Sequence, residues 1–162
     1  MTEQLTLFPL YQGWNTYQEQ LLKAVAPLSR EQMERQTAPQ LRSIGKNITH
    51  IVSVRAGWLY FVLGRGGEDM VALAEWGRRD QPARSAAELV DGLKATWQVI
   101  EEMLSQWTIA DLAVLVEDTD DGGEVQTYTR QWVIWHLIEH DLHHGGELSF
   151  MLGTYGLPGI DI

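Results

Sequence analysis

The sequence predicts one all-α domain spanning residues 1–162: a four-helix bundle with long connections and a small β-hairpin before the last helix. Three observations predict it. The chain has 162 residues and is 44% hydrophobic and 21% charged, which suits one globular domain with a core. Apolar residues recur at helical spacing in four long stretches. Each stretch carries one apolar stripe, and such helices bury their stripes against one another in a bundle.

The first predicted helix runs from about Leu7 to Ala26. Pro27 ends it, because proline cannot donate a backbone hydrogen bond and clashes with the preceding turn. A capping box over residues 29–32 then predicts a short helical turn. The buried stripe of the helix follows steps of four, three, four and seven and consists of Leu10, Trp14, Tyr17, Leu21 and Leu28.

The second predicted helix starts after Ser43, a good N-cap, and runs to Leu63. The glycine-rich residues 64–67 stop it, and residues 65–82 form a long connection with one short turn around residues 70–73. His50 lies at the edge of its apolar side. That side consists of Ile51, Val54, Trp58, Phe61 and Val62.

The third predicted helix begins with a capping box at Ser85 and Glu88. A strict four-three alternation indicates packing along its whole length, through Ala86, Val90, Leu93, Trp97, Ile100, Leu104 and Trp107. Residues 112–116 and 125–128 are then β-prone and flank a turn at 118–123, which predicts the hairpin. This acidic turn is not a calcium loop, because Thr129 stands where the closing glutamate is required.

The fourth predicted helix runs from Tyr128 to Tyr155 and carries four of the five histidines: His136, His140, His143 and His144. His140 and His144 are one turn apart and about 40° apart around the axis, so both imidazoles can reach one metal ion. His136 and His140 share this spacing. The apolar stripe through Val133, Leu137, Leu148, Met151 and Tyr155 contains His140 and His144, whereas His136 and His143 lie at its edge.

Two histidines among aliphatic side chains need polar partners, and a shared metal ion would satisfy both. The remaining histidine, His50, supplies a third ligand from the second helix. Three histidines with open positions are typical of a catalytic metal site. Zinc, nickel and iron all accept imidazole, so the sequence does not select one. The competing interpretation is three core histidines that bond to the backbone or to water.

At these residues the chain resembles the DinB/YfiT-like metalloenzyme superfamily, the DinB-like four-helix bundles. The resemblance covers nearly the whole chain and rests on Ser43-Ile44-Gly45, His50-Ile51 and Trp58-Leu59, on His136-x-x-x-His140-x-x-His143-His144-Gly-Gly-Glu147-Leu148, and on Leu152-Gly153 with the tail 158–161. It implies that His50, His140 and His144 bind the metal.

The chain departs from the family pattern at two places. Gly145-Gly146-Glu147 stands where Arg-Gly-Gln is frequent, and Arg55 stands five positions after the second-helix histidine, where an acidic residue is common. Both changes leave the three ligands intact. They affect the groups that surround the metal and contact the substrate.

Composition excludes several classes of protein. The sequence has no cysteine, so disulfides, thiolate metal sites and a cysteine nucleophile are excluded. A formal net charge of −10 disfavours nucleic acid as a partner. No apolar run approaches the roughly 20 residues that span a bilayer. The N-terminal residues 1–4 do not resemble a signal peptide, and we therefore expect a cytoplasmic protein.

We expect a metal-dependent enzyme with a small-molecule substrate. The resemblance implies a thiol-dependent S-transferase or a hydrolase, because characterised relatives use bacillithiol or mycothiol; any low-molecular-weight thiol must come from outside the cysteine-free chain. Glu147 is the candidate catalytic residue, as a general base or by orienting a ligand histidine; alternatively it simply faces solvent. Tyr11, Trp14 and Trp58 line a pocket or belong to the core.

Two alternatives to an enzyme stay open. One is a non-catalytic metal-binding stress protein, and the other is a structural homodimer. Several relatives form dimers, and seven tryptophans exceed what a small core needs, so a homodimer is expected under any of the three hypotheses.

Overall fold

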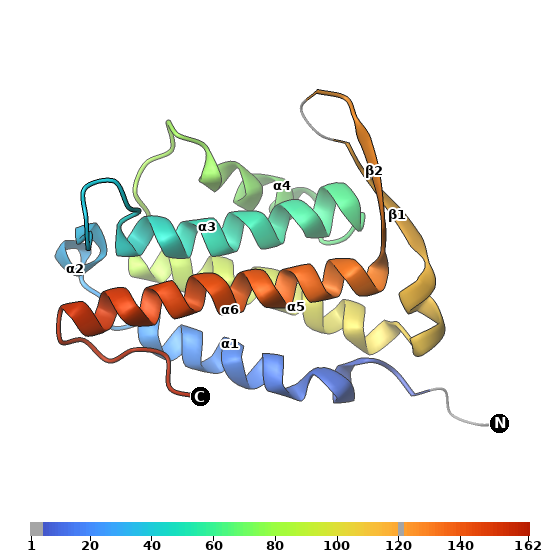
Figure 1. The fold of residues 1–162 in the computed structure, drawn as a ribbon, viewed down its shortest axis with the longest axis horizontal. Coiled ribbons are helices and arrows are strands. Elements are labelled where there is room, and N and C mark those ends of the chain that lie inside the picture. Colours follow the sequence, from blue (N-terminus) through green and yellow to red (C-terminus); the bar gives the residue numbers. More distant parts are fainter. Residues whose placement is uncertain (1–4, 120–121) are drawn as a thin grey trace.

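The structure is a computed structural model that describes residues 5–119 and 122–162. It is mostly helical, with a small antiparallel hairpin directly before the last helix, as predicted (Figure 1). The elements are α1 Gln12–Val25, α2 Arg30–Glu34, α3 Ile44–Gly57, α4 Gly67–Ala74, α5 Ala86–Gln106, β1 Leu115–Thr119, β2 Val125–Thr129 and α6 Arg130–Thr154. In the described part of the chain, no helix is long and apolar enough to cross a membrane.

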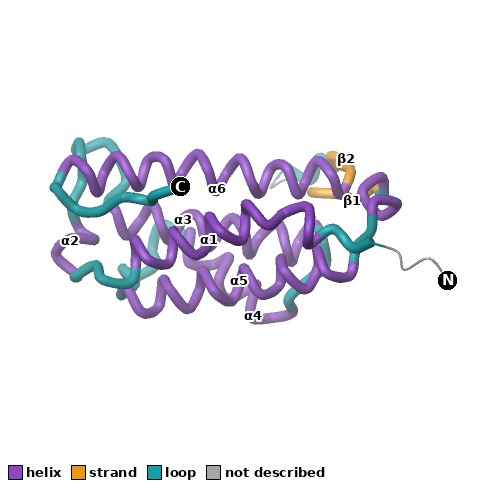
Figure 2. Tube along the Cα trace, turned by 90° about the horizontal axis from the view of Figure 1, so that it is seen from below, coloured by secondary structure: helices purple, strands orange, loops and turns teal. Residues whose placement is uncertain are grey.

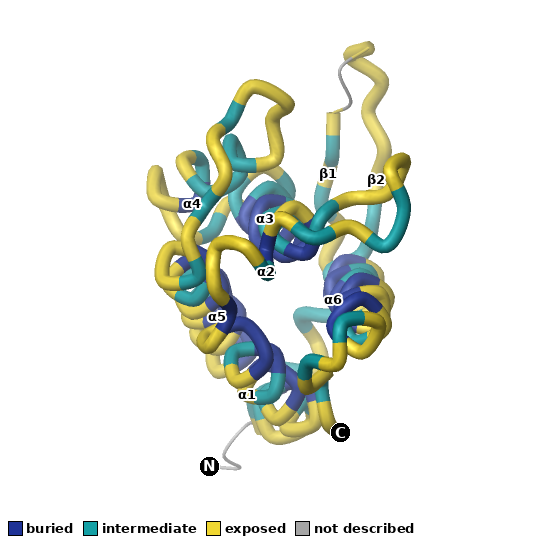
Figure 3. Tube along the Cα trace, turned by 90° about the vertical axis from the view of Figure 1, so that its left-hand side faces the viewer, coloured by how far each residue is buried: buried dark blue, intermediate teal, exposed yellow. Residues whose placement is uncertain are grey.

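The four long helices α1, α3, α5 and α6 lie side by side along the length of the molecule (Figure 2). Helix α3 packs against both α5 and α6, and α1 packs against α5. Seen along the helices, the buried sides of all four face a common interior, while α4 lies against the outside of α3 (Figure 3).

The interior is divided by a polar layer. One apolar cluster contains Leu21, Ile48, Leu89 and Leu148, and a second contains Trp14, Leu59, Ile100 and Leu137. Between the two clusters, each long helix contributes one almost fully buried polar side chain: Gln18, Arg55, Thr96 and Asp141. Burying polar groups costs free energy unless they are hydrogen-bonded. The four helices must therefore pack in an arrangement that lets these side chains form hydrogen bonds.

The predicted start of the first helix needs correction. Residues Phe8–Tyr11 form a 3₁₀ turn, with Pro9 at its start, and the α-helix begins only at Gln12. Leu10 was expected in the buried stripe and is instead 67% exposed. The tighter 3₁₀ turn places its side chains differently from an α-helix, so the stripe begins at Trp14. The capping box at Ser29 and Gln32 is present as predicted.

The second predicted helix has the expected N-cap, Ser43, but its buried face differs from the prediction. A π-helical turn, Trp58–Val62, follows α3 and leaves Phe61 61% exposed. Val54 and Trp58 are only half-buried, and Arg55 takes the buried position beside them. The prediction was wrong here because the apolar side was assigned from apolar residues alone, and a buried arginine does not appear in such a pattern.

The third predicted helix is confirmed, including both hydrogen bonds of its capping box. In the hairpin, β1 starts at Leu115, because residues Ile109–Ala113 form a 3₁₀ turn capped by Thr108 and Asp111. The strands pair from Leu115 with Thr129 to Thr119 with Val125. Of the predicted turn at 118–123, residues 120 and 121 lie outside the described part of the chain.

Candidate metal centre

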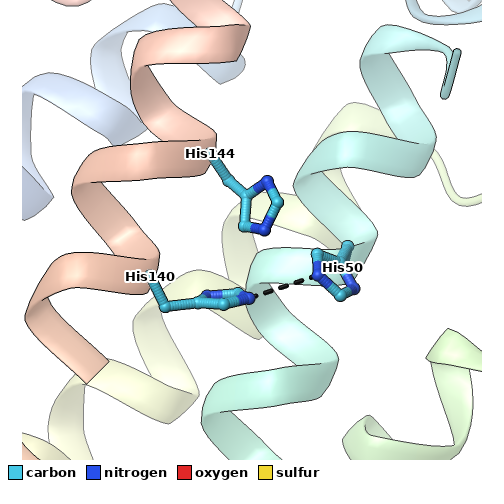
Figure 4. Close-up of side chains that lie close together, drawn as sticks. All are labelled: His50, His140 and His144. Atoms are coloured by element: carbon cyan, nitrogen blue, oxygen red, sulfur yellow. Dashed lines mark hydrogen bonds between the residues drawn. The ribbon is translucent and has the colours of Figure 1, made fainter. Parts of the chain in front are cut away.

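Three histidines from two helices converge where α3 packs against α6 (Figure 4). His50 comes from α3, and His140 and His144 come from successive turns of α6. Their candidate ligand atoms all lie within 4.8 Å of one another, and the Nε2 atoms of His50 and His140 are 3.2 Å apart. His144 is 8% exposed and the other two are half-buried. The structure thus brings together the three predicted ligands.

The packing of α3 on α6 positions the three rings. Ile51, next to His50, and Leu137 and Leu148 on α6 are fully buried, so the apolar faces fix which sides of the two helices meet. The side-chain amide of Asn47 on α3 donates to the backbone oxygen of His144 at 2.8 Å. This bond also fixes how far one helix can slide along the other.

The environment keeps two of these imidazoles neutral. Burial lowers the pKa of His50 to about 4, and the positive charges of Arg42 and His144 add to the effect. Burial, followed by the charges of His144 and His50, lowers the pKa of His140 to about 3. Metal ions bind the unprotonated nitrogen, so both rings are ready to act as ligands at neutral pH.

The spacing of the nitrogens fits a metal ion. Two nitrogens at about 2.0–2.1 Å from a tetrahedral zinc ion are about 3.3–3.4 Å from each other, close to the 3.2 Å between His50 and His140. Among the described residues, no backbone group bonds to the ring nitrogens of His140. His140 Nδ1 is buried without a hydrogen-bond partner among the described residues, and its Nε2 faces another imidazole.

Glu147 contacts a candidate ligand directly. One of its carboxylate oxygens lies 2.7 Å from His144 Nδ1, which leaves Nε2 of His144 free for a metal ion. Burial alone would raise the pKa of Glu147, but the hydrogen bond to His144 and the charges of His144, His143 and Arg42 lower it. A carboxylate of this kind fixes the tautomer and the orientation of a metal-ligating histidine.

The two edge histidines have different surroundings. His143 is exposed and reaches Glu147 at 3.4 Å, so His143, His144 and Glu147 form a second, more open group of candidate ligands. His136 stacks on Trp132 with the rings 5.1 Å apart and 8° from parallel, and it also contacts Glu139. Both groups contain His144. The two groups are therefore alternative sites for one metal ion, and the metal content of variants can distinguish them.

The polar layer supports the centre through a buried ion pair that sequence reasoning missed. The guanidinium of Arg55 donates to both oxygens of Asp141, at 2.8 and 2.6 Å, and both side chains are fully buried. Trp14 Nε1 donates to the same carboxylate at 2.7 Å, so Trp14 belongs to the core and not to a pocket wall. Asp141 directly follows His140, and the pair therefore joins α3 to α6 beside the ligands.

A signal for this pair was present in the sequence. Asp141 lies four residues after Leu137, within the apolar stripe of the last helix. A carboxylate at such a position requires a buried partner. Arg55, which departs from the family pattern on the second helix, is that partner.

A close contact with Tyr17 explains why glycine occupies position 145. A Cβ at Gly145 would lie 1.9 Å from the hydroxyl of Tyr17, which donates to the backbone oxygen of Asp141. A larger side chain at position 145 would therefore require Tyr17 to move. The packing of α1 on α6 therefore favours glycine at this position.

We expect the metal-free protein to lose stability as the pH falls from 7 to 5. The folded state lowers the pKa of His50 and His140 from 6.5 to about 4 and about 3, so the unfolded chain binds protons first and acidification favours it. The stabilisation is complete above pH 6.5 and is lost progressively as the pH falls toward the folded-state values. Urea unfolding at several pH values measures the effect; the variant His140→Asn should show a shallower dependence, and an identical one would contradict the assignment.

Comparisons with known proteins agree with the fold. A family model described as the DinB superfamily matches residues 14–148. The crystal structure of a DinB-like protein from Bacillus cereus ATCC 10987 is similar to this chain, with a TM-score of 0.73 and 23% identity over 99% of both chains. A search of the curated proteins found no match.

Proposed function

This chain belongs to the DinB superfamily, and we propose that it is a metal-dependent enzyme in which His50, His140 and His144 hold one divalent ion. The observation that carries the proposal is the convergence of three imidazoles from two helices, two of them with strongly lowered pKa values. We take the four long helices to form the four-helix bundle of this superfamily, which builds metal sites from facing helices.

Zinc and nickel suit the proposed donor set best, and iron is also compatible with it. A bound ion of this kind supplies Lewis acidity that lowers the pKa of a bound water or thiol. The chain itself contributes the orientation of His144 through Glu147, and the lowered pKa of Glu147 keeps its carboxylate ionised at neutral pH, the form that both a general base and a hydrogen-bond acceptor for His144 require. With no cysteine in the sequence, a thiol nucleophile would be an external low-molecular-weight cofactor.

We propose that the reaction is that of a thiol-dependent S-transferase or a hydrolase that acts on a small molecule in the cytoplasm. A homodimer fits the exposed apolar residues on the outer side of α6, where Trp135 is 57%, Leu142 46% and Phe150 71% exposed. The same residues suit the alternative of a structural homodimer. A non-catalytic metal-binding protein remains the other alternative, because the three histidines would serve it equally well.

Turnover assays on metal-loaded protein test the proposal. Thiols are offered with an electrophile such as chlorodinitrobenzene, and ester and amide panels test hydrolysis. We expect turnover that a chelator removes, and Glu147→Gln should lower kcat by about 100-fold or more at saturating metal if Glu147 is a general base. A variant that loses about 10–100-fold in metal affinity but keeps kcat would show that Glu147 only orients His144.

Two controls make the result interpretable. Glu139→Gln removes an exposed carboxylate from the same helix. Among the described residues its side chain contacts His136, which is not one of the three proposed ligands, so the variant should leave kcat unchanged. Metal content is measured on every sample. A metal-loaded protein without metal-dependent turnover across the whole panel would favour the non-catalytic alternative.

A further inference from the structure

A cavity of about 930 Å³ opens beside the candidate metal centre. It lies between the first turns of α3, the connection from α2 to α3, and the connection from α4 to α5. His50 lines it, so a molecule in the cavity lies next to one of the three proposed ligands. Its volume is in the range of small-molecule sites.

The cavity is strongly cationic, although the chain carries a formal net charge of −10. Half of the 12 lysines and arginines line it: Arg30, Arg42, Lys46, Arg78, Arg79 and Arg84. The acidic residues in the lining are Glu34 and Glu88, and each forms an ion pair with a lining arginine, Arg30 and Arg84 respectively. The concentration of positive charge therefore exceeds what the local carboxylates can neutralise.

Three of these cations have no carboxylate partner in the part of the chain that the structure describes. Within residues 5–119 and 122–162, Arg42, Lys46 and Arg79 form no ion pair. Arg84 does form one, yet its Nε is buried without a hydrogen-bond partner among the described residues. Buried donors normally have an acceptor, so the lining offers more donors than the protein itself satisfies.

The position of Lys46 works against the stability of its own helix. Lys46 lies in the first turn of α3, and Arg42 directly precedes the N-cap, while that turn contains no acidic residue. A helix N-terminus carries about half a positive charge and is stabilised by anions, so two cations there are unfavourable unless a negative group joins them. A bound anion would be attracted by the helix end and by both side chains together.

The charge of Arg42 also reaches the candidate metal centre. It contributes to the lowered pKa of His50, after burial, and to the lowered pKa of Glu147. Arg42 and His50 also line the same cavity. A ligand held by Arg42 would extend naturally toward His50.

We propose that this cavity binds a small molecule with two or more carboxylate or phosphate groups, held at Arg42 and Lys46, and that the opposite end of the molecule faces His50. Binding of the anion stands on the cavity alone, whereas its role as the substrate rests on the proposed function. Nucleic acid is the less suitable polyanion, because the negative charge of the rest of the chain repels a long phosphate backbone.

Calorimetric titration of metal-free protein tests the binding. The probes are tricarballylate, a tricarboxylate, and inorganic pyrophosphate, used at about 50 mM salt so that screening is weak. We expect saturable binding of at least one probe, and the identity of that probe separates carboxylate from phosphate ligands. The double variant Arg42→Gln with Lys46→Gln should raise its Kd by about tenfold or more.

The matched control is Lys23→Gln with Lys94→Gln, which removes the same charge from exposed positions outside the cavity and should change Kd less than about twofold. An equal rise in Kd for both double variants would overturn the proposal, as would the lack of saturable binding up to about 10 mM of either probe. Circular dichroism verifies that both double variants are folded.

Metal content, measured in parallel, separates this proposal from the proposed function. His140→Ala should lose metal and keep anion binding, since His140 does not line the cavity. Anion binding that depends on Arg42 and Lys46 in a protein that takes up no metal would refute the proposed function and leave the anion site standing. Normal metal uptake, together with an unchanged Kd for the anion in the Arg42 and Lys46 double variant, would refute the anion site and leave the proposed function standing.

Discussion

Wild-type protein reconstituted with zinc is expected to hold one ion per chain, and His50→Ala, His140→Ala and His144→Ala are each expected to hold less than about a tenth of an ion. The reason is geometric. The Nε2 atoms of His50 and His140 already lie 3.2 Å apart, and removal of either ring leaves two nitrogens that cannot complete a site. Elemental analysis of protein purified without a histidine tag measures the content.

His143→Ala is the matched control, because it removes an imidazole from the neighbouring position of the same helix. His143 is exposed and belongs only to the second candidate group, with His144 and Glu147. It should retain full metal content. Loss of metal in His143→Ala together with retention in His50→Ala would assign the ion to the second group and refute the three-histidine centre. Thermal unfolding of each metal-free variant verifies that the loss is not a loss of fold.

Local signals in the sequence predicted the features that depend on neighbouring residues. The caps at Ser29, Ser43 and Ser85 were found because each cap bonds to a backbone group three residues away. The spacing of His140 and His144 is likewise a property of one helix. The third ligand, His50, was found because no other histidine remained outside the last helix.

The Arg55–Asp141 pair could not be predicted in this way. Its members are 86 residues apart, and although Asp141 lies in the apolar stripe of its own helix, nothing in that helix identifies Arg55 as its partner. Only the pairing makes burial tolerable, and the pairing is a property of the packed helices. The same holds for the cationic cavity, whose wall includes the connection from α4 to α5, which the sequence identified only as a long connection.

The buried pair also predicts the largest effect on stability. Asp141→Ala should lower the free energy of unfolding by about 3–5 kcal/mol, because it leaves the guanidinium of Arg55 buried without its carboxylate. The loss extends through the polar layer: Arg55 also donates to Gln18 at 2.8 Å, and Gln18 donates to the backbone oxygen of Leu93 at 3.1 Å. Urea unfolding of metal-free protein at pH 7 measures it, and a loss below about 1 kcal/mol would contradict a central role for the pair.

The double variant Arg55→Met with Asp141→Leu separates stability from the geometry of the centre. Replacing both charges with apolar side chains removes the desolvation penalty, so we expect a smaller loss of stability than for Asp141→Ala alone. The metal should nevertheless bind about tenfold more weakly or worse, because Asp141 directly follows His140 and its bonds to Arg55 hold α6 against the helix that carries His50. If the double variant keeps full metal affinity, the apolar faces and the Asn47 bond alone position the histidines. If it loses affinity while remaining stable, the buried pair sets the register of the two ligand-bearing helices more than it stabilises the fold.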